Sequence, residues 1–324
     1  MKKSKNGRRA IIAGIAGQDG SYLAELLIER GYKVLGFMKK GDDTSVLSHL
    51  LKEIVLEETE LVQKDDIIRW TRIFSPDEIY NFAGLSFIPD SWDDPYRAIQ
   101  VNTLLVAAFL EVIKDHCRES RFYQASTSEI FGAPPESPQT ESTPHNPMTP
   151  YGVSKLAAHQ LVGLFRKMHG IFAVSGILYN HESPRRPERF VTQKIARAAA
   201  EITKGKREKL KLGNIEARRD WGFAGDYVRA IWMMLQTDTP EDYIVATGES
   251  HSIKDFLQAA FKHVGLDWEK WVEVDPTLVR IVDVERLVGD YTKAREKLGW
   301  IPKVSFEELV RMMVDSQLQK IEVV

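Results

Sequence analysis

The hydrophobic pattern at the start of the chain predicts a strand, a turn and a helix. Residues 9–14 form a short apolar run that ends in glycine, and over 21–30 the apolar residues recur at helical spacing. Further strands are predicted at Lys33–Met38, Glu60–Gln63, Glu78–Phe82 and Arg121–Ser126. Helical periodicity follows these strands, as over 98–113. Strands that alternate with helices indicate an α/β fold, a Rossmann-like, doubly wound parallel sheet.

Composition and net charge argue against nucleic acid and membrane surfaces as binding partners. The 324 residues are 43% hydrophobic, enough for a full core, and the net charge of −2 gives no general attraction to nucleic acid or to a membrane surface. A small ligand is therefore expected. The one cysteine, Cys117, excludes an internal disulfide and is typical of a reducing compartment, and no apolar run approaches the roughly 18 residues of a membrane span. We expect a cytoplasmic protein.

The turn between the first strand and the first helix carries a glycine pattern. Gly14, Gly17 and Gly20 form G-x-x-G-x-x-G, in which the missing side chains let backbone N–H groups approach a pyrophosphate at the helix N-terminus. Gln18 and Asp19 lie inside this pattern and are expected at the same cofactor site. A tight turn without a ligand is the alternative interpretation.

Residues after the second and third predicted strands bear on the choice of cofactor. Lys39 and Lys40 end the second strand, where an acid would suit the ribose 2′-hydroxyl of NAD and a cation suits the 2′-phosphate of NADP. NADP is therefore favoured, although paired lysines are also common on solvated surfaces and two aspartates follow closely. Asp65, just past the third strand, is placed to accept from an adenine amino group, or else to cap a helix.

The segment PYGVSK predicts a hydride-transfer site. Tyr151 and Lys155 lie four residues apart near the start of a helix that runs to about Met168, so they share one face. A tyrosine that acts as a base near pH 7 needs its pKa lowered by roughly 3 units, about 4 kcal/mol, and one cation at about 4 Å supplies that at an effective dielectric constant near 20. Thr127 follows a strand, where its hydroxyl can bond the same substrate oxygen.

Glu129, two positions after Thr127, suggests a reaction with a second proton-transfer step beyond hydride transfer. A carboxylate in the cleft beside a newly formed ketone can remove the acidified proton on the adjacent carbon. A surface or helix-capping glutamate is the alternative interpretation. This residue therefore distinguishes between reaction classes.

Several longer motifs are shared with one enzyme family. They are GIAGQDGSYLAELL (14–27), PDEIYN (76–81), STSEIFG (126–132), NHESPRR (180–186), FVTQKI (190–195), RRDWGFAGDYVRAIWMML (218–235) and GDYTKAREKLGW (289–300). Together they resemble the extended short-chain dehydrogenase/reductase superfamily and, within it, the GDP-mannose 4,6-dehydratase family. The resemblance covers almost the whole chain.

The resemblance implies a site and a reaction. Thr127, Tyr151 and Lys155 match the family's catalytic residues, and Glu129 matches its general base. Positions that match sugar-nucleotide ligands are Ser86, Asn180, Lys194, Arg219 and Arg280, and no metal is implied. The implied reaction is NADP-dependent dehydration of a GDP-sugar, by oxidation at C4, loss of water across C5 and C6, and return of hydride to C6. A GDP-4-keto-6-deoxy-sugar reductase and a non-catalytic NADP-sensing protein stay open as alternatives.

The resemblance also implies a division of the chain. Residues 1–178, with a return segment near 218–248, are expected to form the dinucleotide-binding domain. Residues 179–217 and 249–324 are expected to form a smaller, mixed C-terminal lobe that binds the nucleotide-sugar. A homodimer or a homotetramer is expected.

Three departures from the family pattern leave details open. Lys39 and Lys40 stand where the family has two arginines, and the loop after them is shorter, so the choice between dimer and tetramer is open. Leu85 replaces a glutamine near the sugar, so the substrate is GDP-mannose or a close relative such as a GDP-manno-heptose. Arg185 and Arg186 are candidates either for the sugar nucleotide or for contact with a neighbouring subunit.

Overall fold

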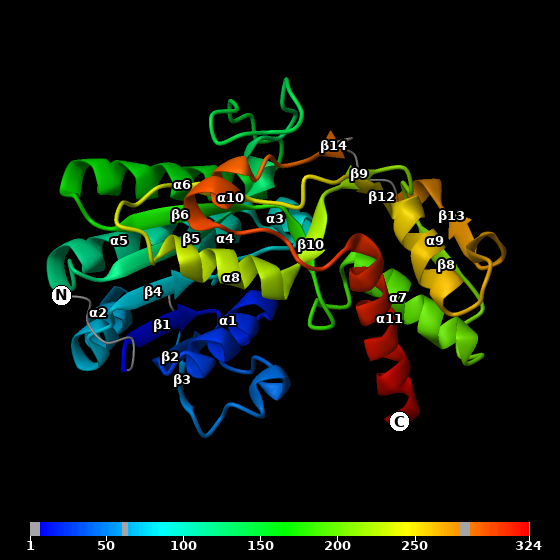
Figure 1. The fold of residues 1–324 in the computed structure, drawn as a ribbon, viewed down its shortest axis with the longest axis horizontal. Coiled ribbons are helices and arrows are strands. Elements are labelled where there is room, and N and C mark those ends of the chain that lie inside the picture. Colours follow the sequence, from blue (N-terminus) through cyan, green and yellow to red (C-terminus); the bar gives the residue numbers. More distant parts are fainter. Residues whose placement is uncertain (1–6, 60–63, 279–285, 324) are drawn as a thin grey trace.

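A seven-stranded parallel sheet organises the N-terminal part of the protein in the computed structural model, which describes residues 7–59, 64–278 and 286–323. The strands are β1 (Arg9–Ala13), β2 (Lys33–Met38), β3 (Ile54–Glu58), β4 (Glu78–Asn81), β5 (Arg121–Thr127), β6 (Ala173–Leu178) and β11 (Tyr243–Val245). Their order is β11-β6-β5-β4-β1-β2-β3, and every neighbouring pair is parallel. The chain starts in the middle and winds outward in both directions, which confirms the predicted doubly wound fold (Figure 1).

Alternation along the strands buries both faces of the sheet. In β1, Ala10 and Ile12 belong to the core on one face, and Ile11 and Ala13 belong to the core on the other. The first face is covered by α1 (Gln18–Glu29) and α8 (Ala224–Met234), and the second by α2 (Lys64–Phe74), α5 (Leu105–His116) and α6 (Pro150–His169). The carboxyl ends of the strands are left for ligands.

The third strand is the exception among the predicted strands, since the others match β1, β2, β4 and β5. The third strand of the sheet is β3, at Ile54–Glu58, and it pairs with β2. The predicted strand at 60–63 lies outside the described residues. The observed strand is only partly buried, with Val55 exposed at the sheet edge, so its pattern lacks the continuous apolar run of the central strands.

One long helical stretch is apolar but belongs to the core. It comprises α4 (Pro95–Ile99), a π-helical turn (Gln100–Leu104) and α5. It runs for 22 residues, from Pro95 to His116, and an 18-residue window within it has a mean hydropathy of 1.3, so among the described residues it is long and apolar enough to cross a membrane. However, 61% of its apolar window is buried inside the protein, where it packs against α2 and α6. It is therefore a core helix of the sheet's second face.

A smaller lobe with a core of its own lies on the right of Figure 1. Its helices α7 (Val191–Thr203), α9 (Ile253–His263) and α11 (Phe306–Val323) pack on one another. Short strands pair as β8 (Leu210–Leu212) with β13 (Val272–Val274), β7 (Asn180–Glu182) with β10 (Trp221–Phe223), and β9 (Arg218–Arg219) with both β12 (His251–Ser252) and β14 (Arg286–Leu287). Two short helices complete the fold, α3 (Ile88–Asp93) and α10 (Thr292–Leu298).

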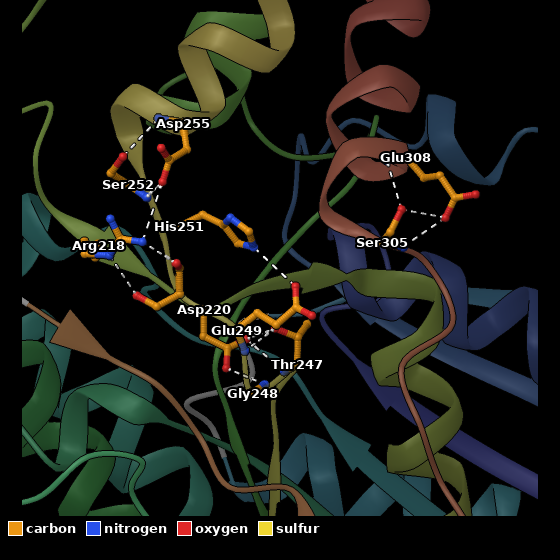
Figure 2. A network of polar contacts seen from close by, with 11 residues as sticks. Arg218, Asp220, Thr247, Gly248, Glu249, His251, Ser252, Asp255, Ser305 and Glu308 are labelled. Atoms are coloured by element: carbon orange, nitrogen blue, oxygen red, sulfur yellow. Dashed lines mark hydrogen bonds and ion pairs between the residues drawn. The ribbon is translucent and has the colours of Figure 1, made fainter.

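Asp220 ties together three segments where the lobe meets the sheet. It lies fully buried between β9 and β10, and its carboxylate accepts hydrogen bonds from the backbone N–H (2.8 Å) and the hydroxyl (2.7 Å) of Thr247 and from the N–H of Gly248 (3.0 Å), as Figure 2 shows. The N–H of Gly289 also donates to it, at 3.3 Å. Burial raises the pKa of Asp220 to about 6, although these hydrogen bonds favour its ionised form.

Candidate active site

A cavity of about 800 Å³ lies at the carboxyl ends of the parallel strands, beside the smaller lobe. Most residues expected at the site from the sequence line it: Gly14, Gly17, Gln18, Asp19, Gly20, Lys39, Ser86, Thr127, Glu129, Tyr151, Lys155, Asn180, Lys194 and Arg219. Asp65, which is exposed on α2, is not among the lining residues. Arg280 lies outside the described residues. The fold therefore gathers residues from widely separated motifs around one space.

The glycine turn can accommodate a dinucleotide phosphate. Gly14 has a φ of +82°, and a Cβ there would lie 2.9 Å from the backbone nitrogen of Ala83. A Cβ on Gly20 would lie 2.3 Å from the carbonyl oxygen of Gly14. Helix α1 has Gly17 as its N-cap, and within the described residues no side chain caps its first backbone N–H groups at the cavity wall. The hydroxyl of Ser126, also in the wall, is buried with no hydrogen-bond partner in the described part of the chain. The residues present fit a cofactor of the NAD(P) class.

The end of β2 carries charges of both signs. Lys39 is exposed and lines the cavity, and its backbone N–H donates to the carboxylate of Asp42 at 2.9 Å. Asp43 lines the cavity as well and accepts from the backbone and hydroxyl of Ser45. Both carboxylates therefore already hold the turn that follows β2.

The expected adenine contact of Asp65 stays a prediction. Asp65 is exposed at the start of α2. Its neighbour Asp66 instead contacts the cavity wall, where its carboxylate accepts from the hydroxyl of Thr59 at 2.9 Å.

Local structure at the start of α6 fixes Tyr151. Thr149 caps the helix by accepting the N–H of Gly152 at 2.9 Å, and Pro150 fills the first helical position. The hydroxyl of Ser91, on α3, accepts the N–H of Tyr151 at 3.1 Å. Tyr151 is 8% exposed and therefore reaches the cavity from a rigid, largely buried backbone.

Lys155 is held by a backbone carbonyl group behind the Tyr151 ring. Its ammonium donates to the carbonyl oxygen of Ala125 at 2.9 Å and lies 5.9 Å from the centre of that ring. Burial raises the pKa of Tyr151 to about 12, a hydrogen bond with Thr127 opposes this, and the charge of Glu129 raises it further. Burial also lowers the pKa of Lys155 to about 8, against the charge of Asp19. In the protein alone, burial therefore outweighs the groups that lower the pKa of Tyr151.

Glu129 lies beside the predicted acid–base pair. It is in the short helix Ser128–Ile130 directly after β5, half-buried, and the hydroxyl of Thr127 caps this turn by accepting its N–H at 3.3 Å. Its charge acts on the phenol of Tyr151, so the two groups are close in space. A carboxylate and a phenol thus share one wall of the cavity.

The smaller lobe contributes polar and cationic groups to the cavity lining. Asn180 is on β7, Lys194 on α7 and Arg219 on β9, where the Arg219 guanidinium donates to the carbonyl oxygen of Arg218 at 2.8 Å. These groups come from three elements that the sheet alone would not bring together.

The two arginines of NHESPRR, Arg185 and Arg186, lie in different surroundings. Arg186 lines the cavity and pairs with Glu182 at 3.1 Å. Arg185 packs on α1 instead, where it donates to the hydroxyl of Ser21 at 3.1 Å and pairs with Glu25. Only Arg186 is therefore placed to meet a ligand in the cavity.

Several lining residues were not singled out from the sequence. Phe87 and Phe190 meet edge to face at 5.4 Å, and Arg189 lies over the Phe87 ring at 4.4 Å and pairs with Asp90 at 2.7 Å. They join α3 to the segment before α7 beside the cavity. His181 is another lining residue, bonded to Asp19 at 2.9 Å. Phe190 and His181 lie inside quoted motifs, but only the fold shows which residues they meet.

Comparison with known proteins agrees with this geometry. The doubly wound sheet, the glycine turn and the Tyr151–Lys155 pair at the strand ends define a protein of the short-chain dehydrogenase/reductase class. UDP-glucose 4-epimerase of Thermus thermophilus, solved in complex with NAD, superposes with a TM-score of 0.85 at 27% identity, covering 95% of this chain and 98% of the epimerase.

Comparison of sequences identifies one family within this class. The family model for GDP-mannose 4,6 dehydratase matches residues 11–313. GDP-mannose 4,6 dehydratase 1 of Arabidopsis thaliana is 45% identical over 96% of this chain and 90% of its own length. The human GDP-mannose 4,6 dehydratase is 42% identical over 96% of this chain and 91% of its own length. The chain belongs to the GDP-mannose 4,6-dehydratase family.

Proposed function

We propose that this protein is an NADP-dependent 4,6-dehydratase of GDP-mannose or a close GDP-sugar. The observation that carries the proposal is that Tyr151, Thr127 and Glu129 line one cavity together with the glycine turn and the lobe's cations. A tyrosine and a carboxylate at one sugar can perform the two proton removals that dehydration needs.

The residues divide the reaction between them. Tyr151 takes the proton of the C4 hydroxyl, and Thr127 holds the oxygen from which that proton leaves. The glycine turn would hold a nicotinamide cofactor, which would supply the hydride chemistry, removal from C4 and return to C6. The new ketone makes the C5 proton acidic, and Glu129 removes that proton and passes it to the C6 hydroxyl, which leaves as water. After hydride has returned to C6, a proton from solvent adds at C5.

Positive charge is needed to activate the tyrosine. Lys155 holds its charge near the phenol through its bond to Ala125. The pKa of Tyr151 is nevertheless raised to about 12 by burial, so its activation depends on further positive charge brought by the ligands. An oxidised nicotinamide ring is a cation of this kind.

The preference for NADP rests on Lys39. Its side chain is exposed at the cavity where β2 ends, while the neighbouring carboxylates of Asp42 and Asp43 hold the turn backbone and Ser45. The lysine is therefore the group at this position with donors to offer a 2′-phosphate.

We place the GDP-sugar against the smaller lobe. Asn180, Arg186, Lys194 and Arg219 supply amide and cationic donors suited to a diphosphate. We assign this role to the lobe formed by 179–217 and 249–324, and the dinucleotide to residues 1–178 with 218–248. A homodimer or homotetramer in the cytoplasm completes the proposal, and sedimentation of the purified protein measures the assembly.

The test is turnover of GDP-mannose by purified protein with catalytic NADP⁺. Formation of a 4-keto-6-deoxy product without net NADPH is expected. Consumption of NADPH on a GDP-4-keto sugar, with no reaction on GDP-mannose, would instead identify a reductase. Binding of NADPH without reaction on either sugar would identify a sensing protein.

A further inference from the structure

One ion pair in the cavity wall joins two segments that lie 162 residues apart. The carboxylate of Asp19, in the glycine turn, lies 2.9 Å from Nε2 of His181 on β7. Nδ1 of the same ring lies 2.7 Å from the carbonyl oxygen of Tyr179. Both ring nitrogens face oxygen acceptors, so both carry protons and the ring is a cation.

Gln18 makes a second link between the same two segments. Its amide donates to the carbonyl oxygen of His181 at 3.1 Å, and its own carbonyl accepts from the hydroxyl of Ser183 at 2.8 Å. The ring of Tyr227, on α8, stacks on the imidazole with 4.8 Å between centroids. The glycine turn and the segment that begins β7 are therefore held in one fixed relation.

The pair also balances charge inside the cavity. Burial disfavours the ionised form of Asp19, but the charge and hydrogen bond of His181 outweigh it and lower the Asp19 pKa. Burial likewise opposes the cation on His181, and Asp19 outweighs it, against the charge of Arg186, so the His181 pKa is raised. Without the imidazolium, a half-buried carboxylate would face any phosphate bound at the N-terminus of α1.

We propose that His181 is a positioning residue that couples the cofactor subsite to the nucleotide-sugar subsite. It fixes the glycine turn through Asp19, and it is part of the segment that presents Asn180 and Arg186 to the cavity. A ligand that orders the cofactor subsite therefore also orders the nucleotide-sugar subsite. By linkage, each ligand raises the affinity of the protein for the other by the same factor. This inference rests on the proposed function, which assigns the turn to the dinucleotide and the β7 segment to the GDP-sugar.

The experiment measures that coupling as a ratio of affinities, without turnover. NADPH is titrated calorimetrically into the wild-type protein, His181→Gln and His263→Gln, each with and without saturating GDP. His263 is a matched control, because it pairs with Asp315 at 2.6 Å in the smaller lobe, at the surface. In the wild type and in His263→Gln, GDP should tighten NADPH binding about fivefold or more. In His181→Gln the ratio should fall to about one.

Asp19→Asn gives a second route to the same result, because it removes the charge and keeps the shape of the side chain. It should lose the coupling too, and it decides the outcome if His181→Gln does not fold, as thermal unfolding will show. Full coupling in the folded variants, or none in the wild type, overturns the inference alone. A wild-type protein that fails to bind NADPH overturns the proposed function and this inference with it.

Discussion

Replacing Glu129 with glutamine should separate oxidation of the sugar from loss of water. The substitution keeps the size of the side chain and removes its charge, in a half-buried position next to Tyr151. Because the Glu129 carboxylate raises the pKa of Tyr151, the variant should have a lower tyrosine pKa and should still oxidise C4. A positioned general base contributes about 10²- to 10⁴-fold to a rate, or about 3 to 5 kcal/mol. Formation of the 6-deoxy product should fall by that factor.

A single-turnover experiment tests both halves. The variant is loaded with NADP⁺ and mixed with GDP-mannose, absorbance follows the reduced nicotinamide, and mass spectrometry follows the product. Reduced nicotinamide should form and persist while product is nearly absent. Glu136→Gln is the matched control, since Glu136 is exposed on the next loop, where it accepts from the hydroxyl of Thr143 at 2.6 Å, and it should behave as wild type. Wild-type product formation by Glu129→Gln would refute its role as the base, as would the absence of any reduced nicotinamide.

Three other substitutions address separate parts of the site and fold. Tyr151→Phe should lose C4 oxidation by at least about 10²-fold and everything after it, and formation of reduced nicotinamide at the wild-type rate would exclude Tyr151 as the base. Lys39→Asp should shift the ratio of NADP⁺ to NAD⁺ affinity towards NAD⁺ in a binding titration, and an unchanged ratio would remove Lys39 from cofactor selection. Asp220 has a folded pKa of about 6, above its unfolded value, so its contribution to stability is present at low pH and is lost as pH rises through 6. Relative to Asp220→Asn, the wild-type free energy of unfolding should therefore increase by about 1 kcal/mol from pH 7 to pH 5, and a pH-independent difference in denaturant titrations would contradict this.

Local sequence spacing was sufficient to predict the parts of the site that depend on one element. Tyr151 and Lys155 share a helix face because they are one turn apart, and the glycine turn lies where a strand gives way to a helix. The sheet was predictable because its central strands are buried on both faces and read as apolar runs. The edge strand β3 was not predicted, because exposure at the edge removes that signal.

Relations between distant segments could not be predicted from the sequence. Nothing near Asp19 in the chain indicates His181, and nothing near Lys155 indicates that the carbonyl group of Ala125 will hold its ammonium. Each partner is brought into place by strand order and by the path of the chain between the sheet and the lobe. The sign of the Tyr151 pKa shift has the same origin, because burial by the whole fold outweighs the hydrogen bond with Thr127 and the charge of Arg186.

The most direct test of the proposed dehydration follows an isotope through one turnover. GDP-mannose deuterated at C4 is incubated with the protein and catalytic NADP⁺ in ordinary water, and the product is analysed by mass spectrometry and proton NMR. Deuterium should appear at C6, a solvent proton should appear at C5, and no NADPH should accumulate. Loss of the label to free cofactor, or a product without deuterium at C6, would contradict internal hydride return and with it the assignment of this site as a 4,6-dehydratase.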